Sequence, residues 1–288
     1  MPELPEVETV VRGLRAALPG RTITGLRLGK TDFISDVARL EAAVPGSTIE
    51  EVRRFGKFIG VRLAAASGSN GNRTASWLLV HLGMTGQFVV CRADSQVRPH
   101  THVWLVLDDA RELRYTDIRR FGKMRVLDAE EMPGFLGRLG TEPLEVSFEA
   151  FCAAISRRTM IKALLLDQRV FRGLGNIYTD ESLWRARIHP RRAGAGLKPG
   201  ERRGLYAAVR KVLADAIRMR GSSISDFVDS SGSPGEYQRR HRAYGREAEP
   251  CYRCGAKIRR IIVAGRSSYF CPKCQRGPRG RARPPRRG

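Results

Sequence analysis

Two prolines and three glutamates lie within the first eight residues, MPELPEVE. The initiator methionine is normally removed before proline, so we expect Pro2 to carry the terminal amine, whose pKa near ~8 leaves an unprotonated fraction at neutral pH. Attack of this secondary amine on a sugar C1′ would give an iminium, an electron sink for elimination, with Glu3 and Glu6 as acid–base groups. The same residues also fit an ordinary helix start, in which acids complement the helix dipole and Pro5 opens the first turn. Taken alone, the first ten residues favour that simpler interpretation.

Four of the six cysteines form the pattern C-x2-C-x16-C-x2-C, at Cys251, Cys254, Cys271 and Cys274. Two such pairs across a hairpin-length insert predict a closed tetrahedral Zn²⁺ site, which is structural because four thiolates leave no position for substrate. Between them, apolar residues alternate around Gly265, which predicts a β-hairpin with Arg266 near its tip. We expect this arginine to contact phosphate; the alternative is a solvated surface arginine.

Two further motifs carry residue types that suit nucleic acid. In GLGNIYTDESLW, glycines precede a helix start at Asn176, where free N–H groups bind phosphate well, although a plain helix cap explains the same pattern. YTDIRRFGKMRV puts two arginines and Phe121 at the end of a strand, and a ring beside a guanidinium can fill a gap in a base stack. Met84 in HLGMTGQF could act in the same way. A single Met or Phe in a β-domain more often packs in the core.

The charge of the chain indicates the class of partner. The 288 residues include 52 Lys and Arg against 29 Asp and Glu, a net charge of +23 that favours an extended polyanion. The alternative is a basic protein that binds anions loosely. No apolar run approaches the ~18 residues of a membrane span, and the acidic start lacks a signal-peptide pattern. With the cysteine clustering, this predicts a reducing cytosolic compartment, and we expect a cytoplasmic, nucleoid-associated protein.

The periodicity of the sequence predicts the elements that must hold these residues. A helix runs from Pro5 to the stop at Pro19-Gly20. Residues 21–128 contain short strands, ITGLRL, FIGVRL, WLLVHLGM, GQFVVC, HVWLVL and ELRYTD, with a hairpin turn at 108–110 and a flexible loop AAASGSNGNRTAS. Several short strands in succession suggest a sandwich or a barrel.

A change of period near residue 140 indicates a second, helical domain. SFEAFCAAI, IKALLLD, NIYTDESLWRA and ERRGLYAAVRKVLADAIRM read as helices. Residues 221–238 read as a long Gly/Ser loop, a length that is usually functional or disordered.

Taken together, these stretches resemble the formamidopyrimidine-DNA glycosylase family (Fpg). The match runs from MPELPEVETVVRGL through HLGMTG, YTDIRRFG, GLGNIYTDE and YGREAEPCYRCG to GRSSYFCPKCQ, nearly the whole chain. The resemblance implies an α+β multidomain fold. Its parts are an N-terminal catalytic β-sandwich with flanking helices (1–138), a helix-two-turn-helix DNA-binding domain (139–244), a zinc finger with one structural Zn²⁺ (245–280) and a disordered basic tail (281–288). It also implies a monomer that binds double-stranded DNA with oxidised bases in the cleft between the domains.

The resemblance further implies a bifunctional enzyme that excises oxidised purines, notably 8-oxoguanine and formamidopyrimidines, and then cuts the strand. Pro2 would be the nucleophile on C1′, Glu3 the proton donor to the sugar or base, and Glu6 a supporting group. Lys57 matches the proton donor for β-elimination and Arg266 the zinc-finger arginine of δ-elimination. The product would be a gap with phosphate on both ends.

Two sets of binding residues follow from the same matching motifs. The DNA-contacting positions are His100, Arg119, Arg157, Lys162 and Asn176. The residues that fill the space left by the flipped nucleotide are Met84, Arg119 and Phe121. The chain departs from the family at Ile118, where proline is more common, at Arg157-Arg158, which replaces a lysine-containing pair, and in a longer loop around 65–74.

Two other functions compete with this reading. Endonuclease VIII, from the same superfamily, prefers oxidised pyrimidines; the loop with SPGEYQ and the gap-filling set fit the Fpg branch better. A non-catalytic DNA-binding paralogue could keep the fold and the finger, but it would tolerate the loss of Pro2 or Glu3, and both are present.

Overall fold

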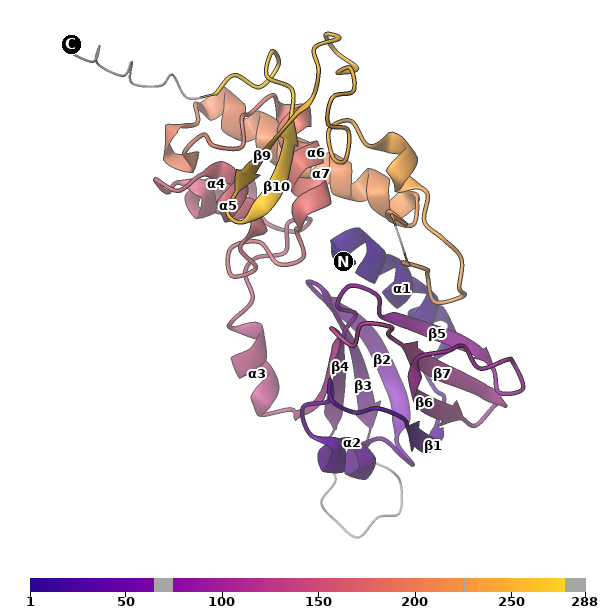
Figure 1. Ribbon diagram of the computed structural model, residues 1–288. Coiled ribbons are helices and arrows are strands. Elements are labelled where there is room, and N and C mark those ends of the chain that lie inside the picture. Colours follow the sequence, from indigo (N-terminus) through magenta and orange to yellow (C-terminus); the bar gives the residue numbers. More distant parts are fainter. Residues whose placement is uncertain (65–74, 225, 278–288) are drawn as a thin grey trace, which may run out of the picture. The chain divides into compact units, whose positions relative to one another are not determined.

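The computed structural model describes residues 1–64, 75–224 and 226–277, in which a series of antiparallel strands is followed by a series of helices and a final hairpin (Figure 1). Residues 65–74 of the predicted flexible loop (64–76) and the predicted tail at 281–288 lie outside the described residues.

The chain divides into two compact units. Unit 1 combines residues 1–140 with residues 214–240, and unit 2 combines residues 141–213 with the chain from residue 241 onward. The first division falls where the sequence changes from strand to helix periodicity. Residues 214–240 group with unit 1, although the sequence analysis assigned them to the helical domain.

Unit 1 contains two four-stranded antiparallel sheets, ordered β1-β6-β7-β5 and β2-β3-β4-β8. The strands of the first sheet are Ile23–Leu28 (β1), Thr101–Leu107 (β6), Arg111–Thr116 (β7) and Gln87–Arg92 (β5). Those of the second sheet are Thr48–Phe55 (β2), Phe58–Ala64 (β3), Ser76–His81 (β4) and Lys123–Asp128 (β8). Apolar side chains of both sheets share one buried core, so the predicted β-sandwich is confirmed.

Strand β2 was absent from the prediction, and the structure shows why. Its buried residues are Ile49, Val52 and Phe55, three positions apart rather than two, and a register shift lies between Ile49 and Glu51. A bulge of this kind inserts one residue and removes the alternation that identifies a strand. Two short helices, Val37–Ala43 (α2) and Glu131–Leu136 (α3), were also not expected.

Helix α1 (Leu4–Ala17) is buried along one face, as predicted. Val7, Val10, Val11 and Leu14 are fully buried in the sandwich core, and burial of each contributes roughly 1.5–3 kcal/mol. The helix ends before Pro19-Gly20, where Gly20 has φ 83°. This packing fixes the amino-terminal end of the chain against the sandwich.

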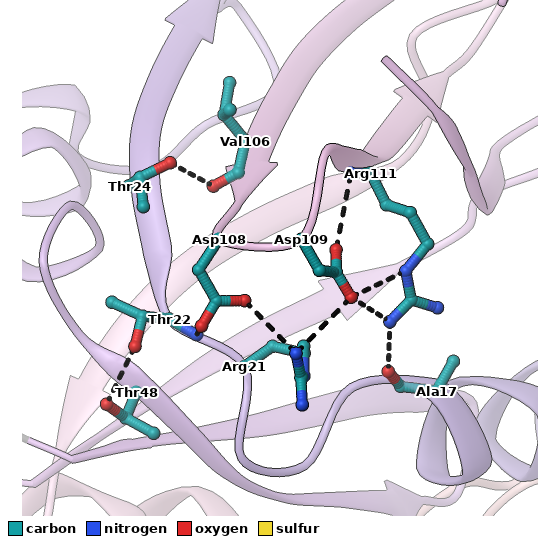
Figure 2. Close-up of polar contacts among 9 residues, drawn as sticks. All are labelled: Ala17, Arg21, Thr22, Thr24, Thr48, Val106, Asp108, Asp109 and Arg111. Atoms are coloured by element: carbon teal, nitrogen blue, oxygen red, sulfur yellow. Dashed lines mark hydrogen bonds and ion pairs between the residues drawn. The ribbon is translucent and has the colours of Figure 1, made fainter.

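Polar side chains fasten the other end of α1 to the turn between β6 and β7 (Figure 2). Arg111 Nη2 donates to the carbonyl oxygen of Ala17 at 2.9 Å and to Asp109 Oδ2 at 2.5 Å. Arg21 Nη1 lies 3.7 Å from carboxylate oxygens of Asp108 and Asp109. The predicted hairpin turn therefore also positions the helix.

The predicted long loop, residues 221–238, is held on the sandwich within unit 1. The Phe227 side chain is buried in the core, and the Val90 N–H of edge strand β5 donates to the Ser230 carbonyl oxygen at 3.0 Å. Gly13 of α1 makes room for this loop, because a Cβ there would lie 1.8 Å from Ser230 Oγ. The loop is thus fixed in its middle, at Phe227 and Ser230, as well as where it follows helix α7 (Pro199–Arg218).

Unit 2 contains the predicted helices and the predicted hairpin. The helices are Phe148–Ile155 (α4), Ile161–Leu166 (α5), Asn176–Ala186 (α6) and the first part of Pro199–Arg218 (α7). Helix α6 is buried from Ile177 to Trp184 and contacts both α5 and the hairpin of Arg259–Val263 (β9) and Arg266–Phe270 (β10). No helix in the described ranges is long and apolar enough to cross a membrane.

Candidate active site and nucleic-acid interface

The amino-terminal segment enters the structure as a buried turn. Pro2 is buried, and the side chains of Glu3 and Glu6 are 3% and 1% exposed. The Glu3 N–H donates to Glu6 Oε2 at 2.8 Å, a capping-box contact that fixes the first turn of α1. The predicted nucleophile and both predicted carboxyl groups therefore lie together, on a helix end held by core packing.

The charged groups predicted for catalysis act on the terminal amine. The pKa of the Met1 amine is lowered from its ordinary value, mainly by burial. The positive charges of Lys57 and Arg119 lower it further, while Glu3 and Glu6 oppose the change. An amine in these surroundings is less protonated at neutral pH, as a nucleophile requires.

Lys57 lies in the tight turn between β2 and β3, and it is only 8% exposed. His81 on β4 is nearby: burial, then the charges of Lys57 and Lys123, lowers the pKa of its ring to about 4. The Gly83 N–H donates to His81 Nδ1 at 3.1 Å, so the neutral ring carries its proton on Nε2. The sequence analysis missed His81; its place before the Met84 turn was the available signal.

Glu6 also joins α1 to the loop after α7. The Ser222 N–H donates to Glu6 Oε1 at 2.7 Å. Gly221 has φ 77°, and a Cβ there would lie 2.7 Å from the same oxygen, so the contact requires glycine. One buried carboxylate therefore binds both the amino-terminal turn and the predicted long loop.

A second buried carboxylate, Asp117, shapes the turn that follows β7. Asp117 is 0% exposed and accepts from Thr85 Oγ1 at 2.5 Å, Tyr115 Oη at 3.0 Å and the Gly122 N–H at 2.9 Å. The Arg119 N–H donates to it as well, at 3.3 Å. The sequence analysis did not identify Asp117, because a lone Asp beside two arginines reads as a surface charge.

The predicted gap-filling residues lie in or next to the turn that Asp117 holds. Phe121 is 54% exposed, with the Arg119 Cζ 4.5 Å from its ring centre. Met84 is 40% exposed, and a Cβ on the preceding Gly83 would lie 2.5 Å from backbone atoms of the Phe121–Gly122 turn. The two turns thus pack back to back and expose an arginine, a ring and a thioether, which suits insertion into a base stack.

The other predicted DNA contacts have different surroundings. His100 is exposed with φ 64°, and its carbonyl oxygen accepts from the Asp117 N–H at 3.0 Å. Arg157 is exposed in the segment between α4 and α5 of unit 2. Both positions are accessible to a phosphate.

Lys162 is buried, whereas we expected it to contact DNA at the surface. Its side chain is 0% exposed, and Nζ donates to Asp180 Oδ1 at 2.7 Å and to the Ser267 carbonyl oxygen at 2.8 Å. Asn176 Nδ2 donates to the same carbonyl oxygen at 2.9 Å. In this structure Lys162 therefore cannot reach a phosphate, and it supports strand β10 instead. Arg266, at the start of β10, is exposed.

Helix α6 also holds the segment that leads into the cysteine cluster. Glu181 is 2% exposed, and its carboxylate accepts from the backbone N–H groups of Arg242, Ala243 and Tyr244 at 2.8–3.0 Å. Asp180 thus binds the finger at Tyr269, and Glu181 binds the segment that leads into the finger. The motif GLGNIYTDE predicted a role for Asn176, whereas the structural roles of Asp180 and Glu181 in the same motif were not predicted.

The four cysteines form one cluster. The sulfur atoms of Cys251, Cys254, Cys271 and Cys274 all lie within 4.8 Å of one another. Tetrahedral Zn²⁺ with bonds of about 2.3 Å needs sulfur atoms about 3.8 Å apart, and Cys254 Sγ lies 3.5 Å from both Cys271 and Cys274 Sγ. The donor set and its size therefore fit a metal ion, and the predicted hairpin lies between the two cysteine pairs.

Comparisons with known proteins agree along the chain. Residues 1–124 match the formamidopyrimidine-DNA glycosylase N-terminal domain, residues 139–228 the H2TH domain of the same proteins, and residues 248–277 the zinc finger found in FPG and IleRS. The formamidopyrimidine-DNA glycosylases of Heliobacterium modesticaldum and Solibacter usitatus are each 44% identical over 96% of this chain and 100% of their own length. The Lactococcus lactis Fpg solved with DNA containing an abasic site has a TM-score of 0.85 and 32% identity over 96% of this chain and 100% of that one.

Proposed function

We propose that this chain, which belongs to the formamidopyrimidine-DNA glycosylase family, removes oxidised purines from double-stranded DNA and then cuts the strand. The proposed substrates are 8-oxoguanine and formamidopyrimidines. One observation carries the proposal: Pro2, Glu3 and Glu6 are buried together in the amino-terminal turn, where the charge of Lys57 acts on the amine of Met1.

The proposed excision step uses Pro2, once Met1 has been removed, as the nucleophile. Its nitrogen forms a bond to C1′ as the glycosidic bond breaks, and the electron pair of that bond leaves with the base. Glu3 supplies the proton that the departing base or the opening sugar needs. The Pro2 nitrogen loses its proton, and the C1′–O4′ bond then breaks, with its electron pair going to O4′, which takes up a proton. The product is an iminium between Pro2 and C1′, with Glu6 as a supporting group.

Strand cleavage follows from the iminium, which makes the C2′ proton acidic. Loss of that proton breaks the C3′–O3′ bond, and the electron pair leaves with the phosphate, for which Lys57 is the proposed proton donor. Loss of a C4′ proton then breaks the C5′–O5′ bond, where the proposed role of Arg266 is to bind the departing phosphate. These two eliminations leave a gap with phosphate on both ends.

The remaining residues are proposed to bind DNA or to fold the finger. Arg119, Phe121 and Met84 would occupy the space left by the extruded nucleotide, and His100, Arg157 and Asn176 would contact the backbone. The four cysteines would hold one Zn²⁺, whose contribution is to fix the finger. The net charge of +23 supports affinity that falls steeply with salt. We further propose that the protein acts as a monomer in the cytoplasm, associated with the nucleoid.

A competition assay tests the substrate class. Duplexes carrying one 8-oxoguanine opposite cytosine are mixed with duplexes carrying thymine glycol, each with its own label, and cleavage is followed with time. We expect faster cleavage of the 8-oxoguanine strand. Preference for thymine glycol would instead support an endonuclease VIII specificity, and tight binding without cleavage of either duplex would support a non-catalytic DNA-binding protein.

A further inference from the structure

The outer edge of strand β10 is bound by a buried ion pair. The carbonyl oxygen of Ser267 accepts from Lys162 Nζ at 2.8 Å, and the Tyr269 N–H donates to Asp180 Oδ2 at 2.9 Å. The two side chains also form an ion pair with each other, with 2.7 Å between Lys162 Nζ and Asp180 Oδ1, and they are 0% and 1% exposed. Two successive outward-facing backbone groups of the strand therefore meet one charged pair from α5 and α6.

The hairpin needs such an anchor, because two paired strands alone are only marginally stable in water. Its base is fixed at Cys271, directly after β10, where the second cysteine pair begins. Its tip is open: apart from the glycine and its two chain neighbours, no described heavy atom lies within 4 Å of where a Cβ on Gly265 would be. The contact at Ser267 is thus the anchored point adjacent to Arg266, which follows the Ala264–Gly265 turn with its positive φ angles of 50° and 70°.

We infer that Lys162 and Asp180 are positioning residues for Arg266: they hold the Ser267 carbonyl and the Tyr269 N–H so that the guanidinium at the tip is presented in one place. This inference rests on the proposed role of Arg266 in δ-elimination. A cation that must bind the phosphate leaving C5′ loses effect when it is displaced, because an error of about 1 Å can cost about a hundredfold in rate. In the proposed mechanism base excision and β-elimination do not use Arg266, so we expect neither step to depend on this anchor.

The test variant replaces the pair by apolar residues of similar size, Lys162→Met with Asp180→Leu. A single change would leave one buried charge unpaired, whereas the double change removes both charges and keeps the packing. Excision, β-product and δ-product are measured in single turnover on an 8-oxoguanine duplex. We expect the δ-step to slow roughly ten- to hundredfold, with accumulation of β-product, while excision changes less than about twofold.

A control variant separates positioning from loss of folding. Arg253→Met removes a guanidinium that donates to the Trp184 and Arg185 carbonyl oxygens at the end of α6, so it loosens the finger without touching β10. At matched zinc content and matched loss of Tm, we expect it to keep the δ-step of the unaltered protein. An equal slowing in Arg253→Met would show a general effect of loosening and would overturn the inference.

Arg266→Gln separates this inference from the function on which it rests. Slow δ-elimination in Arg266→Gln with a normal δ-step in the double variant would overturn the positioning role and leave the proposed function standing. A normal δ-step in Arg266→Gln would refute the role of Arg266, and the inference with it. If the double variant does not retain zinc, Lys162→Leu with Asp180→Met, a second apolar pair that cannot bind the Ser267 carbonyl or the Tyr269 N–H, replaces it under the same criteria.

Discussion

The Glu6 carboxylate accepts the N–H of Ser222 at 2.7 Å, across 216 residues of sequence. Its second oxygen holds the Glu3 N–H at 2.8 Å. The loop that begins at Gly221 and the amino-terminal turn are therefore bound to the same buried group. A shift of the loop changes the hydrogen bonds of the turn that carries Pro2.

Glu6→Gln should break this link. Glutamine offers one oxygen and an NH₂ group, so one of the two backbone N–H donors would face another donor, at a cost of about 1–3 kcal/mol. We expect excision of 8-oxoguanine to fall roughly ten- to hundredfold, with a smaller change in the Kd for undamaged duplex. Glu8→Gln is the matched control on the same helix, because its carboxylate pairs with Arg12 and Arg54 instead. Equal losses in both variants would contradict the coupling.

Asp117→Asn should disturb the support of the gap-filling residues. The carboxylate accepts from Thr85 and Arg119 on one oxygen and from Tyr115 and Gly122 on the other. The amide has a single acceptor oxygen, so it can serve only one of these two groups of donors. We expect about 1–3 kcal/mol lower stability in denaturant unfolding and a smaller fluorescence change of 2-aminopurine placed beside the lesion. The exposed Asp94→Asn is the control, and an unchanged fluorescence signal in Asp117→Asn would refute the support role.

Stability should fall as the solution becomes acidic. Burial, then the charges of Lys57 and Lys123, depresses the pKa of His81 from 6.5 to about 4, and burial likewise lowers the pKa of His241 to about 4. Because the folded state resists protonation, each histidine contributes stability that is present above pH 6.5 and is lost as the pH falls through 4, at most about 3 kcal/mol. Guanidinium unfolding from pH 7 to 4 measures the slope. His81→Gln and His241→Gln should each flatten it, and an unchanged slope would contradict the prediction.

Removal of the metal should cost DNA binding and not the amine chemistry. The cysteine cluster and the hairpin belong to unit 2, whereas the terminal amine and its carboxyl groups belong to unit 1. After chelation we expect the Kd for lesion duplex to rise strongly, while the amine still reacts with a small aldehyde under reduction at the rate of the untreated protein. If chelated protein bound the duplex normally, the finger would not be a DNA contact.

Much of the fold could be read from local patterns. The helix from Leu4, the strands with period-two alternation and the Gly265 hairpin follow from apolar spacing and turn residues. Strand β2 could not be read, because its bulge replaces alternation by a spacing of three. The grouping of residues 214–240 with unit 1 depends on contacts such as Ser222 with Glu6, which no local pattern contains.

The site residues divide in the same way. The cysteines were found because their spacing is regular. Pro2 and Glu3 were assigned through the resemblance to the family, since their stretch alone favours an ordinary helix start. Asp117 and His81 were missed, because their importance lies in what surrounds them and not in their type. Lys162 was expected to contact DNA from the resemblance to the family, and only the structure shows that Asp180, one turn into α6, provides a buried partner.

The central claim is that the amine of Pro2 forms the covalent intermediate, and borohydride trapping tests it most directly. The protein is incubated with a duplex carrying 8-oxoguanine opposite cytosine in the presence of borohydride, and the adduct is digested and sequenced by mass spectrometry. We predict one protein–DNA adduct on Pro2, with Met1 absent, and none in Pro2→Gly on the same time scale. An adduct on a lysine, or tight binding without any adduct, would contradict the account.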